Sequence, residues 1–166
     1  MLPASLPDDA RLWLFAADRA LSLEEQTALL DVLRPFFAGW TSHGRPVTGA
    51  AEVLEDRVVA LGATLSGDLS GCGIDQMQHA LDEGAARLGV AWLSPLDVAY
   101  RDGNGWHTVS RAAFRALARE GAVTPDTHVL DVTAATVGDL RANGVVRPAH
   151  AAWHGRAFGL ALPAGA

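Results

Sequence analysis

Apolar positions in the first half of the chain follow the period of a strand and then that of a helix. Residues 11–16 form a short apolar run that predicts a strand. Apolar side chains then recur at helical spacing from Leu29 to Trp40. This helix starts at a capping box, in which Ser22 caps the first turn and Glu25 reaches back. Pro35 lies inside the segment, so we expect a kink or a split there.

Two more strands and a second helix follow. Residues 47–54 and 57–66 predict strands joined by a tight turn, and the helix before them is expected to end with Gly44 as its C-cap. A helix with an apolar stripe then starts near Cys72 and stops at Gly89, before a short strand over 90–93. The order β-α-β-β-α-β predicts an α+β fold, with a ferredoxin-like split core over residues 1–95.

The remaining residues, 96–166, predict a small α/β extension packed on this core. Residues 102–105 form a strong hairpin turn between two short strands. Ser110 is expected to cap a helix that Gly121 ends. A strand at 128–131 and a short helix over 136–143 complete the pattern.

Composition excludes several kinds of chemistry. The 13 basic residues of this 166-residue chain are all arginines, which excludes a Schiff-base lysine and a P-loop of the usual form. The net charge is −6 and the arginines are scattered, so nucleic acid and anionic membranes are not expected partners. With one cysteine, no apolar run long enough to span a bilayer and no signal-peptide pattern, the expected compartment is the cytoplasm.

The most informative motif is the run from Ser70 to Asp75, which contains the only cysteine. It lies where a predicted strand ends and the second helix starts. The N-terminus of a helix offers backbone N–H groups and a partial positive charge, which favour a thiolate or a bound anion. We therefore expect a small-ligand or anion site here. Its expected ligand residues in this run are Ser70, Gly71, Gly73 and Asp75. If the C-terminal tail reaches the site, Trp153 and His154 are expected to bind the ligand as well.

The split topology also suggests a catalytic pair. The loop after the first helix contains His43, and this loop and the start of the second helix lie at the same edge of such a sheet. Cys72 as nucleophile and His43 as base would suit a thiol-dependent enzyme. Alternatively, Cys72 is a small packed residue, since free cysteine is among the most buried residue types.

Other candidate ligands are less specific. His79 falls beside the apolar stripe of the second helix and is expected to be a partly buried core histidine. Trp153 either plugs the core or folds over a pocket as a lid, and the pattern favours the plug. We assign no metal and no cofactor.

The chain contains a distinctive set of motifs at residues 10–15, 21–25, 40–44, 70–75, 124–127 and 152–154. Together these motifs resemble an uncharacterised family of short bacterial proteins, and the resemblance covers nearly the whole chain. Its members often carry the automatic label "ABC transporter ATPase", which the residues do not support because no Walker lysine is present. The resemblance implies no mechanism. A third alternative is therefore a structural or protein-interaction module, with a homodimer formed through an open sheet edge.

Overall fold

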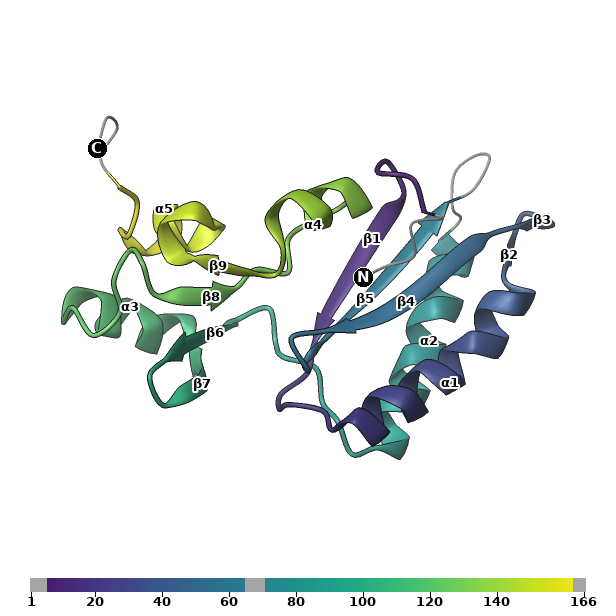
Figure 1. The fold of residues 1–166 in the computed structure, drawn as a ribbon, viewed down its shortest axis with the longest axis horizontal. Coiled ribbons are helices and arrows are strands. Elements are labelled where there is room, and N and C mark those ends of the chain that lie inside the picture. Colours follow the sequence, from purple (N-terminus) through teal and green to yellow (C-terminus); the bar gives the residue numbers. More distant parts are fainter. Residues whose placement is uncertain (1–5, 65–70, 163–166) are drawn as a thin grey trace. The chain divides into compact units, whose positions relative to one another are not determined.

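The computed structural model describes residues 6–64 and 71–162, without the side chains of residues 71 and 72. The chain divides into two compact units (Figure 1). Unit 1 contains Met1–Trp92 and Thr133–Ala142, and unit 2 contains Leu93–Val132 and Asn143–Ala166. Both units mix helix and strand, so the predicted α+β class is confirmed.

Unit 1 is built on a three-stranded antiparallel sheet in the order β1-β5-β4. The central strand is buried along nearly all of its length, which explains its continuous run of small and branched apolar residues. The turn between β4 and β5 contains Glu55 and Asp56, both with positive φ, as the sequence predicts. The three strands are β1 (Arg11–Ala16), β4 (Thr48–Leu54) and β5 (Val58–Thr64).

Two helices, α1 (Leu23–Gly39) and α2 (Gly71–Arg87), lie side by side along the sheet of unit 1 (Figure 1). Their apolar stripes meet those of the sheet in one core, where Leu29, Leu33, Met77 and Leu81 are fully buried. Gly84 lets the helices approach, because a Cβ there would lie 2.8 Å from Leu29 Cδ1. The capping box at the start of α1 is confirmed by its two reciprocal hydrogen bonds.

The end of α1 differs from the prediction. The helix continues through Pro35 without a split and is capped at Trp40, not at Gly44. His43 and Gly44, both with positive φ, instead form the turn of a small hairpin between β2 (Thr41–Ser42) and β3 (Arg45–Pro46). Two successive residues with left-handed backbone conformation suit a tight hairpin turn. Gly44, which we expected to cap the helix, is therefore part of this turn instead.

The predicted ferredoxin-like topology is not confirmed, because its fourth strand is missing from the sheet of unit 1. Within residues 90–93, Trp92 makes one isolated bridge to Ala17 at the end of β1. Elsewhere the free edge of β1 is occupied by the segment before α4 (Val137–Asn143), through a bridge from Thr136 to Arg11. The Leu12 N–H also donates to the Ala135 carbonyl at 2.9 Å. A distant segment thus occupies the edge that the predicted strand required.

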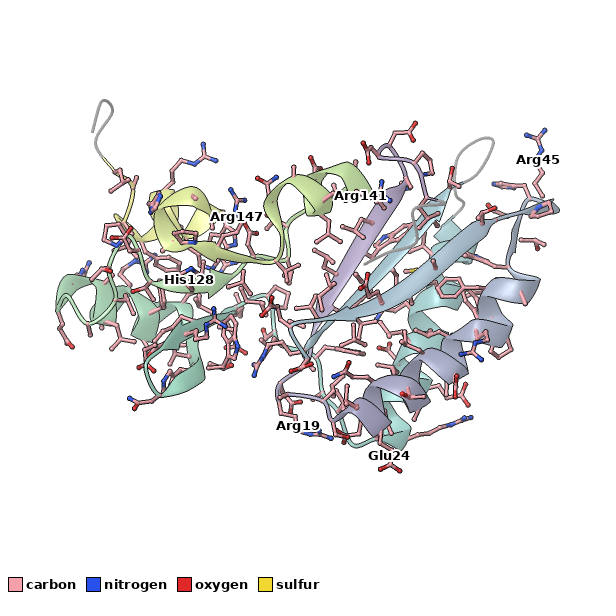
Figure 2. All side chains as sticks on the ribbon, in the orientation of Figure 1. Arg19, Glu24, Arg45, His128, Arg141 and Arg147 are labelled. Carbon is pink, nitrogen blue, oxygen red and sulfur yellow. The ribbon has the colours of Figure 1, made fainter. Side chains whose placement is uncertain are left out.

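Helix α4 is tied to unit 1 by polar contacts to the N-terminal segment. Arg141, labelled in Figure 2, donates to the Leu6 carbonyl at 2.9 Å and forms an ion pair with Asp8. The N–H groups of Val137 and Gly138 donate to the carbonyls of Ala10 and Asp8. These bonds explain why residues 133–142 belong to unit 1 although they lie within the range predicted for the extension.

Unit 2 contains a four-stranded antiparallel sheet in the order β7-β6-β8-β9. The predicted hairpin at residues 102–105 is confirmed by the pairing of β6 with β7. Ser110 accepts a hydrogen bond from the Ala113 N–H and so caps α3, also as predicted. The elements are β6 (Asp97–Asp102), β7 (Gly105–Ser110), α3 (Arg111–Arg119), β8 (His128–Leu130), β9 (Val146–Pro148), the 3₁₀ helix η1 (Ala149–Ala151) and α5 (Trp153–Phe158).

The core of unit 2 is centred on Phe114, which is fully buried. Phe158 of α5 packs edge-on against its ring at a centroid distance of 4.9 Å. Val98 of β6 and Val129 of β8 close the core from the sheet. Within the described residues, neither unit contains a helix that is long and apolar enough to cross a membrane.

Candidate functional site

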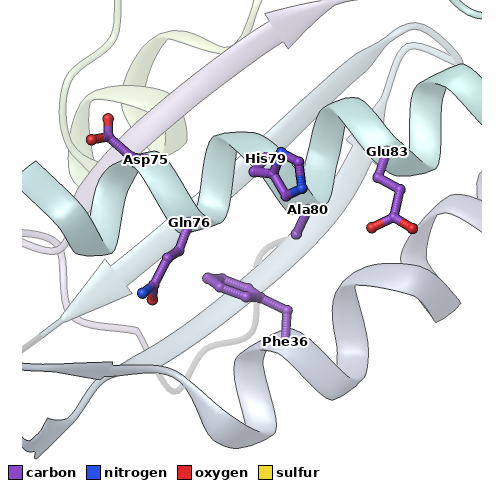
Figure 3. A pocket seen from close by; sticks show the side chains of 6 residues that line it. All are labelled: Phe36, Asp75, Gln76, His79, Ala80 and Glu83. Carbon is purple, nitrogen blue, oxygen red and sulfur yellow. The ribbon is translucent and has the colours of Figure 1, made fainter.

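A shallow groove of about 470 Å³ lies between α1 and α2 of unit 1 (Figure 3). Gln76, Ala80 and Glu83 of α2 project toward α1, as their spacing of four and three residues requires of one helix face. Phe36 is the single lining residue from α1. The full lining is Phe36, Asp75, Gln76, His79, Ala80 and Glu83.

The aromatic wall of the groove is held in place by its neighbours on α1. The Phe36 ring packs against Phe37 and Trp40, with centroid distances of 5.6 and 5.1 Å. Trp40 is buried and belongs to the core of unit 1. Phe36 itself is half-buried, so part of its ring borders the groove. A ring fixed in this way offers a flat apolar surface to a ligand.

The polar groups of the groove come from α2. The amide of Gln76 and the imidazole of His79 form no hydrogen bond within the described part of the chain. The Glu83 carboxylate forms an ion pair with Arg87 one turn further along the helix. Asp75 points away from Phe36, on the other side of α2 (Figure 3). Glu83 is therefore the carboxylate that faces the groove, and the lining residues include no arginine, which does not favour an anion.

This groove corrects one prediction from the sequence. His79 is exposed, whereas its position beside the apolar stripe predicted a partly buried core residue. The reason is the placement of α1, which covers Met77 and Leu81 but leaves the face with His79 open. Sequence reasoning identified only Asp75 among the lining residues. The spacing of Asp75, His79 and Glu83, each four residues apart, was an available signal of a common exposed face.

His43 lies in the exposed turn of the β2–β3 hairpin. Strand β2 contacts α2, and the hairpin lies at the end of unit 1 where α2 begins (Figure 1). Ser70 and the side chain of Cys72 lie outside the described residues, so the Cys72–His43 pair and the anion site stay predictions. The predicted ligand residues Gly71 and Gly73 form the first turn of α2.

Trp153 and His154 belong to the core of unit 2. Their rings are stacked at a centroid distance of 4.0 Å, and His154 also packs against Phe114 and Phe158. Trp153 is half-buried and packs on the core residues, an arrangement that resembles the plug favoured by the sequence pattern. His154 is 1% exposed, so its imidazole is a structural part of this core.

Burial changes the acid–base behaviour of His154. Loss of hydration lowers the pKa of this imidazole from 6.5 to about 4, and the nearby Arg111 acts in the same direction. Asp131 opposes the shift, but this buried carboxylate is itself paired at 3.2 Å with Arg147 of β9, which is labelled in Figure 2. Within the part of the chain that the structure describes, the His154 Nδ1 atom has no hydrogen-bond partner. His154 is therefore neutral in the folded protein at neutral pH.

Among the described residues, no three His, Cys, Asp or Glu side chains are grouped so that they could hold a metal ion. Comparison with models of protein families, with curated proteins and with solved structures finds no match to this chain.

Proposed function

We propose that this protein is a small-molecule-binding module whose ligand occupies the groove between α1 and α2. The observation that supports the proposal best is the half-buried Phe36 ring, which packs against Trp40 and shares the groove with the exposed polar side chains of Gln76 and His79. Small-molecule sites commonly combine an apolar wall with a few orienting polar groups.

The lining favours a particular class of ligand. A planar aromatic ring would stack on Phe36, a contact that contributes about 0.5–1.5 kcal/mol beyond area burial. The amide of Gln76 would accept or donate a hydrogen bond at the edge of that ring. The Glu83 carboxylate favours an uncharged or cationic head group over an anionic one. The proposed groove shares only Asp75 with the site predicted from the sequence, and the proposal also changes the expected charge of the ligand.

Three probes with the same ring test the charge class. Benzamide, benzamidine and benzoate differ in the charge of one substituent, and their binding can be followed by ligand-detected NMR. We expect benzamide and benzamidine to bind more tightly than benzoate. A preference for benzoate would instead support the anion site predicted at the first turn of α2.

Matched variants test the location. Phe36→Ala is expected to weaken binding of benzamide about three- to tenfold through loss of stacking. Phe36→Leu, which keeps an apolar side chain, separates loss of the aromatic face from collapse of the groove. Gln78→Ala serves as the control on the same helix, because Gln78 bonds to Asp82 and does not line the groove. Equal binding by wild type and Phe36→Ala would refute the assignment.

A further inference from the structure

Three exposed arginines follow one face of α3 in unit 2. Arg111, Arg115 and Arg119 are four residues apart, so they recur about every 6 Å along the helix. The nine residues of α3 include no carboxylate. These three side chains, the arginine stripe, therefore form a row of positive charge on a chain whose net charge is −6.

Two of the three guanidinium groups are positioned by aromatic rings of α5. The Arg111 guanidinium lies over Trp153 at 4.9 Å from the ring centroid, and that of Arg115 lies over Phe158 at 5.4 Å. Both rings pack in the core of unit 2. Stacking covers one face of a guanidinium and leaves its N–H edge available, so the side chain is already ordered for bidentate binding of a carboxylate.

The arginines of the stripe are not neutralised by ion pairs within the described residues. Within the described residues, none of the three arginines forms an ion pair. Like charges four residues apart on a helix destabilise it by a few tenths of a kcal/mol. Glu120 follows the stripe at the C-cap and is exposed. An unpaired row of this kind has a cost in the isolated protein that a negatively charged partner would remove.

We propose that the arginine stripe binds an acidic helical segment of a partner protein. Carboxylates at positions i, i+4 and i+8 of a helix recur with the same 6 Å step as the arginines, so the two rows can pair in register. Nucleic acid is the less suitable polyanion, because its higher charge density would be repelled more strongly than a short acidic helix by a chain with a net charge of −6. This interaction involves unit 2 and is independent of the groove in unit 1.

A fluorescein-labelled alanine-based peptide with glutamate at three successive i, i+4 positions is the probe, and fluorescence anisotropy with the full chain is the measurement. We expect saturable binding at 25 mM salt that weakens at 250 mM salt. Arg115→Gln is expected to reduce the affinity about two- to fivefold. The double variant Arg111→Lys with Arg115→Lys keeps the charge but loses planar stacking, and is expected to bind more weakly than wild type.

Control variants and control ligands test whether binding depends on the arginine stripe and on the charge of the peptide. Arg34→Gln removes an exposed helical arginine from α1 of unit 1 and is expected to leave the affinity unchanged. A peptide with glutamine in place of glutamate is expected not to bind. Equal affinity for both peptides, an unchanged affinity in Arg115→Gln, or tighter binding of a short DNA duplex than of the acidic peptide would each overturn the proposal.

Discussion

The buried imidazole of His154 makes the stability of this protein depend on pH in a way that one substitution removes. In the folded state the pKa is lowered to about 4, chiefly because burial removes the hydration of the charged form, whereas the unfolded value is 6.5. As the pH falls below 6.5, the unfolded chain binds a proton that the folded chain does not. The contribution of neutral His154 is therefore complete above pH 6.5, falls as the pH falls from 6.5, and is lost once the pH has passed through 4.

The two pKa values determine how much the free energy of unfolding changes with pH. A full shift of this size corresponds to about 3 kcal/mol, and linkage places about 2 kcal/mol of the loss between pH 7 and pH 5. His154→Leu removes the titrating group at similar side-chain volume, and it also removes the unpartnered Nδ1 atom. We expect the variant to lose about 2 kcal/mol less than wild type over this range.

Urea unfolding followed by tryptophan fluorescence at pH 7, 6 and 5 measures this difference. Wild type, His154→Leu and the control His128→Gln are compared, since His128 is an exposed residue of β8 in the same unit. Contributions from unit 1 are common to all three proteins and cancel. His154→Phe is the second variant if leucine packs poorly, because the comparison uses the slope with pH and not the absolute stability.

The reasoning is refuted if wild type and His154→Leu lose the same free energy between pH 7 and pH 5. A direct titration of the His154 ring protons by NMR gives an independent check, with an expected midpoint near 4. A midpoint near 6.5 would mean that the ring is hydrated in solution.

Two further substitutions test the packing and the caps. A Cβ at Gly155 would lie 2.9 Å from the backbone oxygen of His150, so Gly155→Ala is expected to lower the free energy of unfolding by about 2 kcal/mol. Gly103 has open space around it, so Gly103→Ala is expected to change that free energy almost not at all in the same unfolding assay. Ser22→Ala removes the cap of α1 and is expected to lower the free energy of unfolding by about 1 kcal/mol in thermal or urea unfolding. Thr27→Ala in the same helix is the control and should change this free energy little. Equal effects of the two variants would contradict the role of the cap.

The candidate groove could be predicted only in part from the sequence. The sequence places Asp75 near the start of a helix, and this residue does line the groove. His79 was expected to be a partly buried core residue because of its spacing, and Phe36 was not singled out at all. Which side of a helix is covered depends on the position of the neighbouring helix, and the spacing of residues within one helix does not contain that information.

The amino-acid sequence by itself determined the local elements of this protein. The capping box at Ser22, the cap at Ser110 and the hairpin turn at residues 102–105 all rest on hydrogen bonds between residues a few positions apart. Only the tertiary structure decided which segment of the chain occupies the free edge of β1. Leu12 pairs with Ala135 there, and the predicted strand at residues 90–93 keeps only one bridge. Segments far apart in the chain compete for such an edge, and the outcome depends on their packing, which local periodicity does not report.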